Sequence, residues 1–258
     1  MLRRLLPGPV AREPPLRCIG CAVMMMASCA ALSTPPSRST GSNAAAVASG
    51  HQWLDRARKS RSGTPWSAGI SASLRLATSG QVFEGRGGMA VAPERAVRLI
   101  LLMAGGPTLL DVWVTPERWR VAVPARGTVE RGSGAARAGL PVSFLQRRFL
   151  NPFEGALIEA SASETDLVMV VRDRDAMLEI RAGRCDGGDL TRTATRVRGL
   201  LVDQFDECLA PEGPRPGNWA HYRDVATGLT ADVKFESVSV GTLDDAAFVD
   251  PDGVGLTP

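Results

Sequence analysis

Residues 68–132 read AGISASLRLATSGQVFEGRGGMAVAPERAVRLILLMAGGPTLLDVWVTPERWRVAVPARGTVERG. Short apolar runs alternate here with polar residues, and Gly, Pro and charged residues interrupt them at regular intervals. Between Ile70 and Leu76 every second side chain is apolar, a period of two that predicts a β-strand with one buried face. The stretch therefore predicts a curling antiparallel sheet around which the rest of the chain is arranged. Four further strands of this sheet, joined by tight turns, are predicted at 81–92, 95–104, 108–115 and 118–123.

A short amphipathic helix is predicted ahead of the sheet, over residues 51–58. It opens with a capping-box pattern, Ser49 three residues before Gln52. Trp53, Leu54 and Ala57 then fall on one helical face, which we expect to pack on the sheet. A basic run in this segment either contacts anionic lipid or forms the solvated face of the helix, and it consists of Arg56, Arg58, Lys59 and Arg61.

A two-part helical insertion is predicted after the sheet. Val142, Leu145 and Phe149 recur at helical spacing between residues 140 and 149, and a second helical piece is predicted at 153–160. The insertion either plugs one open face of the sheet or forms a lid over an apolar cavity.

Strands resume after the insertion. In one of them, Arg192, Arg196 and Arg198 occupy one face, which either binds an anion or is a solvated surface that protects a sheet edge. These later strands are predicted at 167–171, 176–181, 190–201, 219–224 and 229–240.

The first 28 residues predict a lipoprotein signal peptide. Arg3, Arg4, Arg12 and Arg17 precede an uncharged run at 19–31, which is shorter than the roughly 20 residues that cross a bilayer. The letters MASC that end at Cys29 resemble a bacterial lipobox, in which the cysteine becomes lipidated. Ordinary secretory cleavage near Ala27 or Ala30 is the alternative.

Residues 29–50 predict a flexible tether, because small and polar residues dominate them and cannot bury enough apolar area to fold. Residues 51–254 then predict one folded domain. The formal net charge of +3 equals the excess of the leader's four arginines over Glu13, so the remainder is neutral. Charge therefore gives no support for a nucleic-acid partner.

Two cysteines remain once the leader and Cys29 are set aside. In an oxidising compartment, Cys185 and Cys208 predict a disulfide, and two unpaired buried thiols are the alternative.

Catalytic and metal-binding motifs are missing from the sequence. It contains no G-x-S-x-G elbow, no H-E-x-x-H helix and no Walker-type loop. His221 lies on a predicted strand, and the glycines at 85–88 lie within another, which indicates a bulge or bend rather than a phosphate cradle. The acidic, glycine-containing stretches at 185–189 and 250–253 are typical of turns. We therefore expect no enzymatic activity, no metal and no cofactor.

The order of parts resembles the LolA/LolB-like lipoprotein-carrier superfamily of bacterial envelopes. GPTLLDVWV at 106–114, followed by WRVAVP at 119–124, is similar to the turn, apolar strand and hairpin of that family. LDDAAFVDPDGV at 243–254 is similar to the family's closing segment, in which an aromatic residue is followed shortly by Pro-x-Gly.

This resemblance implies an α+β fold, a strongly curved, unclosed antiparallel β-barrel (a half-barrel) covered by short helices as a lid. It implies a hydrophobic cavity that receives an acyl chain of a lipoprotein or a free lipid. For the single arginine with which the soluble carrier holds its lid shut, Arg75, Arg95 and Arg98 are alternatives. The implied cavity lining is Leu99, Leu101, Leu110, Val112, Val121, Phe144, Leu145 and Phe149.

Three functions follow as expectations. The first is a lipid-anchored module that binds an acylated ligand, placed on the periplasmic side of the outer membrane because Ala30 follows Cys29. The second is a structural envelope lipoprotein whose sheet is filled by its own side chains and which serves as a scaffold for an envelope protein partner. The third is an exported hydrolase, for which the sequence identifies no nucleophile, base or metal.

Overall fold

The computed structural model describes residues 44–61, 63–77, 79–134, 142–150, 153–186, 188–210 and 213–252. The predicted signal peptide (1–28), Cys29 and Gly253 lie outside these ranges. Within them, helices that are both apolar enough and long enough to span a bilayer are absent.

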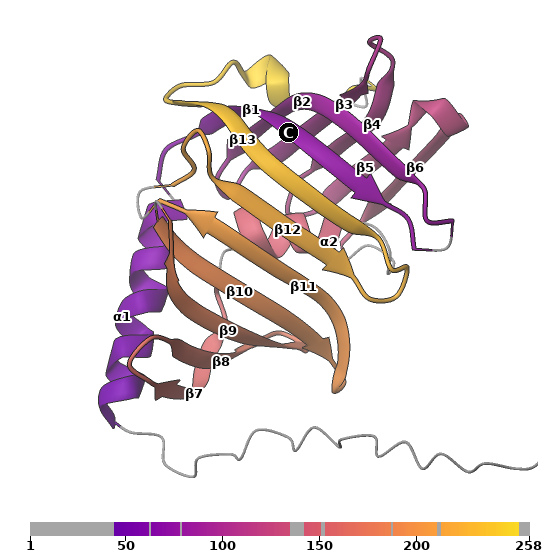
Figure 1. The fold of residues 1–258 in the computed structure, drawn as a ribbon. Helices are drawn as coiled ribbons and strands as arrows, with labels where there is room; N and C mark the ends of the chain where they lie inside the picture. Colours follow the sequence, from indigo (N-terminus) through magenta and orange to yellow (C-terminus); the bar gives the residue numbers. More distant parts are fainter. Residues whose placement is uncertain are drawn as a thin grey trace, which may run out of the picture. The chain divides into compact units, whose positions relative to one another are not determined.

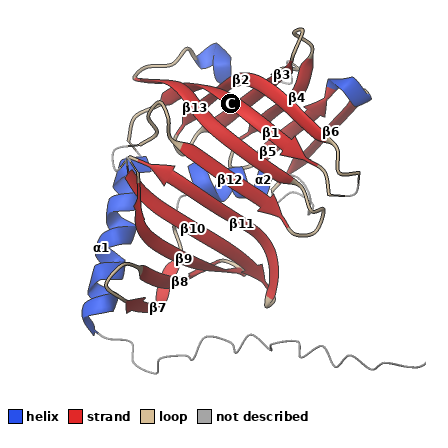
Figure 2. Ribbon diagram, viewed as in Figure 1, coloured by secondary structure: helices blue, strands red, loops and turns tan. Residues whose placement is uncertain are grey.

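The described fold is mostly β and consists of one 13-stranded antiparallel sheet with short helices (Figures 1 and 2). The helices are α1 (Ala44–Arg61), α2 (Val142–Leu145) and η2 (Gln146–Leu150), with single turns η1 (Pro124–Arg126) and η3 (Asp245–Phe248). The strands are β1 (Trp66–Arg75), β2 (Val82–Ala92), β3 (Ala96–Met103), β4 (Thr108–Val114), β5 (Arg118–Val123), β6 (Thr128–Ser133), β7 (Ala156–Ala162), β8 (Leu167–Asp173), β9 (Ala176–Cys185), β10 (Gly188–Val197), β11 (Leu200–Leu209), β12 (Trp219–Asp224) and β13 (Thr230–Val240).

The strand order is β6-β5-β4-β3-β2-β1-β13-β12-β11-β10-β9-β8-β7. All neighbours except β1 and β13 are also consecutive in the chain, so two meanders are joined by the pairing of the first strand with the last. The sheet is unclosed, with β6 and β7 at its edges. The segment that holds α2 and η2 connects these two edge strands in the sequence.

The register of the strands places the apolar residues of the first meander on one face. Directly opposed residues in antiparallel strands share a face. Val121 opposes Val112, Val112 opposes Leu99, Leu99 opposes Met89 and Met89 opposes Ala68. We call this the inner face.

The same face continues through the second meander. Beginning on β13, Val233 opposes Ala220, Ala220 opposes Glu207, Glu207 opposes Thr191 and Thr191 opposes Ala182. The inner face therefore extends from β5 to β9 without interruption.

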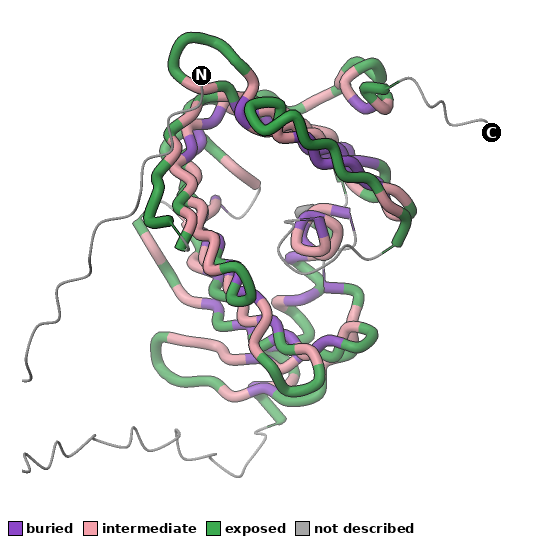
Figure 3. The backbone as a smooth tube through the Cα atoms, turned by 90° about the vertical axis from the view of Figure 1, so that its right-hand side faces the viewer, coloured by how far each residue is buried: buried purple, intermediate pink, exposed green. Residues whose placement is uncertain are grey.

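Three apolar clusters of the described residues lie on the inner face, and the smallest is formed by Phe205 on β11 with Ala220 and Tyr222 on β12. The first covers β1–β5 and includes α2 and η2, whereas the second covers β7–β9 and includes α1, whose Leu54 is 1% exposed. Figure 1 shows α1 running beside β7 and β8, and Figure 3 shows buried residues concentrated where helices and sheet face each other. Between the clusters, β10 and β11 contribute a row of buried polar side chains, which we call the polar seam: Thr191, Thr195, Asp203 and Glu207.

Helix α1 begins earlier than the sequence pattern indicates. Residues 44–50 belong to the predicted tether but are helical in the structure. Alanines dominate these residues and favour a helix. Ala46 is buried in the second cluster, and Gly50 lies close to Leu157 and Ala160 of β7. Packing on the edge of the sheet therefore orders the end of the segment.

The second helical piece predicted at 153–160 is wrong, because Ala156–Ala162 forms the edge strand β7. Its backbone pairs with β8, and its Ala160 is buried against α1. A short apolar segment has little intrinsic preference, and pairing with the free edge of β8 satisfies its backbone hydrogen bonds.

The single strand predicted at 190–201 is also wrong. It is divided into β10 and β11 by a turn in which Arg198 and Gly199 have positive φ values of 51° and 82°. Arg198 thus leaves the face it was expected to share with Arg192 and Arg196, both of which are exposed.

The C-terminal segment packs against the face of the sheet opposite the inner face, which we call the outer face. The Trp113 indole donates a hydrogen bond of 2.8 Å to the Phe248 carbonyl, and the Phe248 ring is buried with Ala92 and Ala96. Arg120 joins Asp111 at 2.9 Å and Asp252 at 2.6 Å, which ties the end of the described chain to β4 and β5.

Candidate functional site

Residues 142–150, which we call the lid segment, cover the inner face of the first meander. Val142 and Leu150 are fully buried and Leu145 nearly so, all within the first apolar cluster. The ring of Phe144 lies 4.5 Å from that of Phe205 on β11, and the Phe149 ring lies 6.1 Å from that of Trp66 on β1. The lid segment therefore contacts both meanders.

Polar contacts hold the lid segment at three points. Gln146 donates a hydrogen bond of 3.0 Å to the carbonyl of Thr115, which follows β4. On the polar seam, Arg147 pairs with Asp203 at 2.7 Å. Arg148 donates from Nε to Glu207 Oε2 at 3.0 Å, and its Nη2 pairs with Glu207 Oε1.

The pKa shifts on the seam have burial as their main cause. Burial raises the pKa of Asp203 above its ordinary value, while Arg147 and the Thr195 hydroxyl oppose that rise. Burial also raises the pKa of Tyr222, with a further contribution from Asp203. The lid segment's Arg147 thus offsets part of the rise in the pKa of Asp203 that burial causes.

A cavity of about 530 Å³ opens beside the lid segment on the inner face. This volume lies within the range of roughly 300–1,000 Å³ that small-molecule sites occupy. The side chains of its wall come from α1, β1, the lid segment and the polar seam, and include Trp53, Arg56, Trp66, Arg148, Phe149 and Glu207.

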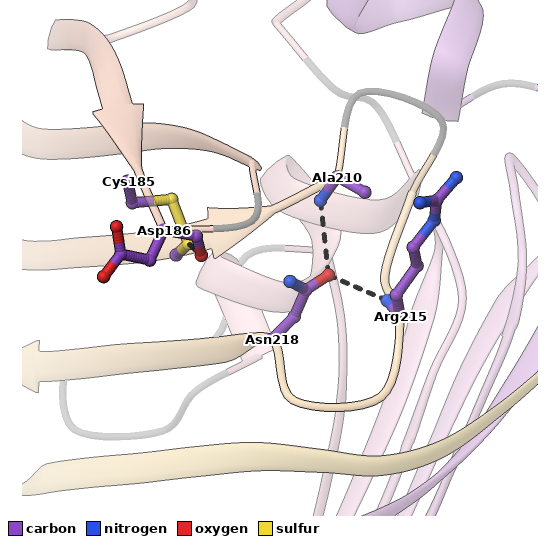
Figure 4. Close-up of a disulfide and its surroundings, with 6 residues drawn as sticks. Cys185, Asp186, Ala210, Arg215 and Asn218 are labelled. Carbon is purple, nitrogen blue, oxygen red and sulfur yellow. Dashed lines mark hydrogen bonds between the residues drawn. A yellow bond between two sulfur atoms is a disulfide. The ribbon is translucent and has the colours of Figure 1, made fainter.

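Figure 4 shows a turn that borders the cavity and a disulfide near that turn. The side-chain oxygen of Asn218 accepts hydrogen bonds from the backbone N–H groups of Ala210 at 3.2 Å and Arg215 at 2.8 Å. Ala210 lines the cavity. Cys185 at the end of β9 and Cys208 on β11 form a disulfide across β10, with their Cα atoms 6.1 Å apart.

The structure brings together the residues that the resemblance assigned to the cavity lining. All belong to the first apolar cluster: Leu101, Val112, Val121 and Leu145 are buried, and Leu99, Leu110, Phe144 and Phe149 are partly buried. They pack against one another, and Phe149 also borders the 530 Å³ cavity. Their role in ligand binding stays a prediction.

The three arginines considered as a latch for the lid are either paired with residues outside the lid segment or exposed. Arg95 pairs with Asp245 at 2.8 Å, Arg98 pairs with Asp111 at 2.8 Å, and Arg75 is exposed at the end of β1. The arginines that hold the lid segment are Arg147 and Arg148, which the sequence analysis missed.

A signal for these two arginines was present in the sequence. Two consecutive cations stand between Phe144 and Phe149 in a segment expected to be buried. A buried arginine requires a paired acid.

A larger hollow, of about 1,680 Å³, lies on the opposite face of β13, β1, β2 and β3. Its side chains include Ser67, Ser71 and Ser73 together with charges of both signs, such as Glu84 and Arg86. This hollow lies on the face of the sheet opposite the inner face and therefore differs from the predicted cavity.

Residues with acid–base or ligating chemistry are dispersed on the sheet. Among the described residues, no group of three His, Cys, Asp or Glu side chains could hold a metal ion. His221 contacts Asp232 on the neighbouring strand at 2.6 Å, on the face opposite the buried Asp224. This geometry is that of an exposed cross-strand pair.

No protein-family model matches the sequence, and no curated protein is significantly similar to it. Solved structures are similar in fold. A LolA superfamily protein from Nitrosomonas europaea is 12% identical, with a TM-score of 0.51 over 78% of this chain and 97% of that one. A domain provisionally assigned as an outer membrane lipoprotein-sorting protein from Vibrio parahaemolyticus is 13% identical, with a TM-score of 0.51 over 76% of this chain and 94% of that one.

A DUF1329 family protein from Desulfovibrio piger is 11% identical, with a TM-score of 0.54 over 81% of this chain and 99% of that one. These identities are too low to transfer an activity. They confirm the predicted resemblance at the level of the fold: this chain shares its architecture with a LolA superfamily protein.

Proposed function

We propose that this protein is a lipid-anchored lipoprotein on the periplasmic side of the outer membrane, whose sheet binds an acyl chain of a lipoprotein or a free lipid. One observation carries the proposal. A short lid segment with apolar side chains covers the inner face, ion pairs hold it there, and a cavity of ligand size opens beside it.

We infer that the sheet curves around the lid segment as a half-barrel. Strands β4 and β11 are six neighbours apart in the strand order. In a flat sheet that separation would be about 29 Å, at about 4.8 Å per strand. Yet Gln146 contacts the residue after β4 while Arg148, two residues later, contacts β11. Contacts this close support a sheet whose halves approach each other.

The inner face of the first meander is apolar, so an acyl chain can take the place of the lid segment on it. The lid segment buries Val142, Leu145 and Leu150 on the sheet. Each such burial stabilises the closed state by about 1.5–3 kcal/mol. An acyl chain offers the sheet the same kind of apolar contact, so a bound chain would offset the cost of displacing the lid segment.

Ligand uptake tests this function directly. Lipid extraction of the purified protein followed by mass spectrometry is expected to find an acyl-containing molecule, and the delipidated protein is expected to take up a fluorescent fatty acid. An empty extract together with no uptake would count against the carrier function.

The second candidate is a structural lipoprotein that serves as a scaffold for an envelope protein. It is favoured by the packing of all eight residues assigned to the cavity lining into one cluster with the lid segment. Uptake distinguishes the two functions, because a self-filled core has no place for a fatty acid.

The anchor has its own test. We expect Cys29→Ser to abolish incorporation of radiolabelled palmitate in the bacterial host, because the sulfur of Cys29 is the predicted acceptor. Cys185→Ser/Cys208→Ser is the matched control and should be labelled as the wild type. Persistent labelling of Cys29→Ser would show that the lipobox interpretation is wrong.

A further inference from the structure

Arg148 has one side of its guanidinium group paired and the other unpaired. Its Nε and Nη2 face Glu207, and the two side chains are 6% and 3% exposed. No described residue accepts a hydrogen bond from its Nη1, although that atom is buried. Leaving a buried donor without a partner costs about 1–3 kcal/mol, and more for a charged group.

Two aromatic rings fix the position of this guanidinium. Its Cζ lies 5.6 Å from the centre of the Phe153 ring and 5.5 Å from the centre of the Phe205 ring. Cations within about 6 Å of a ring centre are attracted to it. The side chain is therefore held in place rather than free to turn toward solvent.

Arg148 also lines the 530 Å³ cavity, and so does its partner Glu207. These two charges cancel. The other charged residues of the wall are Arg56 and Lys59 on α1 and Asp189 at the start of β10. The cavity as a whole therefore carries one positive charge in excess, beside a buried N–H donor without a partner.

We propose that the cavity binds an amphiphile by its anionic head group, a carboxylate or a phosphate, and that Arg148 Nη1 donates to the head-group oxygen. The proposal deepens the proposed function, since it assumes an acyl ligand and adds the chemistry of its polar end. The chain of the ligand lies on the apolar part of the wall, against Trp53, Trp66 and Phe149. Charge-assisted hydrogen bonds from arginine to an oxyanion are about twice as strong as neutral ones.

Binding of three matched probes to the full-length protein tests the proposal. Palmitate and lysophosphatidate with one palmitoyl chain carry an anion, whereas hexadecanol carries the same chain length without a charge. Quenching of Trp53 and Trp66 reports occupancy. We expect the wild type to bind at least one of the anions about tenfold or more tightly than hexadecanol. One hydrogen bond to a charged group accounts for a difference in affinity of this size.

A double variant removes the donor without leaving a buried charge. Arg148→Met/Glu207→Gln keeps side chains of similar size, and its preference for the anion should fall to less than about threefold. The matched control is Arg147→Met/Asp203→Asn, which removes the other lid pair, outside the cavity wall, and should keep the full preference. Circular dichroism verifies that each variant is folded.

If the double variant does not fold, a second double variant replaces it. Its replacement is Arg148→Leu/Glu207→Leu: two apolar side chains remove the donor and both charges of the pair, so the preference should again be lost. Equal binding of all three probes to the wild type, or an unchanged preference in the Arg148 variants, overturns the head-group proposal and leaves the acyl function standing. Failure of every probe to bind, hexadecanol included, overturns both. Which anion binds more tightly distinguishes a carboxylate from a phosphate ligand.

Discussion

Gly87 on β2 pairs with Leu101 on β3, on the inner face of the sheet. The pairing of β2 with β1 and β3 runs through Gly87 without a register shift, so the glycines at 85–88 do not form the bulge that the sequence pattern allowed. A Cβ on Gly87 would overlap the Ile100 carbonyl oxygen. Glycine is required here because the two backbones come close together.

We expect Gly87→Ala to destabilise the protein by about 2 kcal/mol or more, because the overlapping atom belongs to the backbone and cannot rotate away. Gly88→Ala is the matched control, since its Cβ would meet nothing closer than the Ala68 carbonyl oxygen at 3.8 Å. Urea denaturation of both variants measures the difference. Equal midpoints would contradict the close approach.

The folding stability of the protein is expected to depend on the ionisation of Asp252. Hydrogen bonds from Arg120 and Arg131 lower the pKa of Asp252 below its ordinary value of 3.8. Because the folded state favours the ionised form, this stabilisation is complete above pH 3.8 and is lost as the pH falls through the folded-state pKa. Wild type should therefore be more stable than Asp252→Asn near pH 6, and the difference should disappear in strong acid. A gap in denaturation midpoints that stays constant down to pH 2 would argue against this linkage.

The disulfide joins the two outer strands of the β9–β10–β11 unit. Cys185 and Cys208 are separated by 23 residues in the sequence, and their bond spans the strand between them. In the chain-entropy model, closing a loop of this length stabilises a fold by about 3 kcal/mol. Cys185→Ser/Cys208→Ser should lower the unfolding free energy by a similar amount in urea denaturation. A reductant should weaken the wild type and leave the double variant unchanged, and a wild type insensitive to reductant would speak against the bond.

In helix α1, Arg58 of the basic run has a role that neither alternative of the sequence analysis assigned to it. Arg58 donates from Nε to the Phe153 carbonyl at 2.8 Å and from Nη2 to the Gly155 carbonyl at 3.0 Å, and so ties α1 to the chain just before β7. Arg56 and Lys59 border the cavity instead. The interpretation of this run as a membrane contact therefore no longer includes Arg58.

At the scale of the whole molecule, the two larger apolar clusters share one face and are separated by the polar seam and the small cluster around Phe205. The lid segment covers the first cluster and α1 covers the second. Helix α2, with four residues, and η2, with five, are too short to be stable alone, so their order comes from the sheet beneath them. The sheet in turn depends on both covers to bury its inner face.

Leu54→Ala should therefore destabilise the whole domain rather than α1 alone. Leu54 is 1% exposed in the second cluster, and truncating such a side chain typically costs about 2–5 kcal/mol. We expect the transitions followed by far-ultraviolet circular dichroism and by tryptophan fluorescence to shift together. Val82→Ala, at an exposed position, is the control and should change little. Loss of α1 at a low urea concentration, with the sheet melting as in the wild type, would refute this dependence.

The sequence by itself determined strands β1 to β5 and the two cysteines that pair. Period-two patterns and turn residues are local properties, so 108–115 and 118–123 could be assigned to within one residue of β4 and β5. The assignment of residues 153–160 to a helix failed because a short apolar segment takes the structure that its neighbour offers, here the edge of β8.

Only the tertiary structure decided which charges meet. The pairing of β1 with β13 joins the two meanders, so that the inner face of β4 continues into that of β11. The segment between the edge strands β6 and β7 lies on this face, where Arg147 pairs with Asp203 and Arg148 pairs with Glu207. More than fifty residues separate these partners in the sequence. No local pattern encodes such a contact, since it depends on the register of every strand between them.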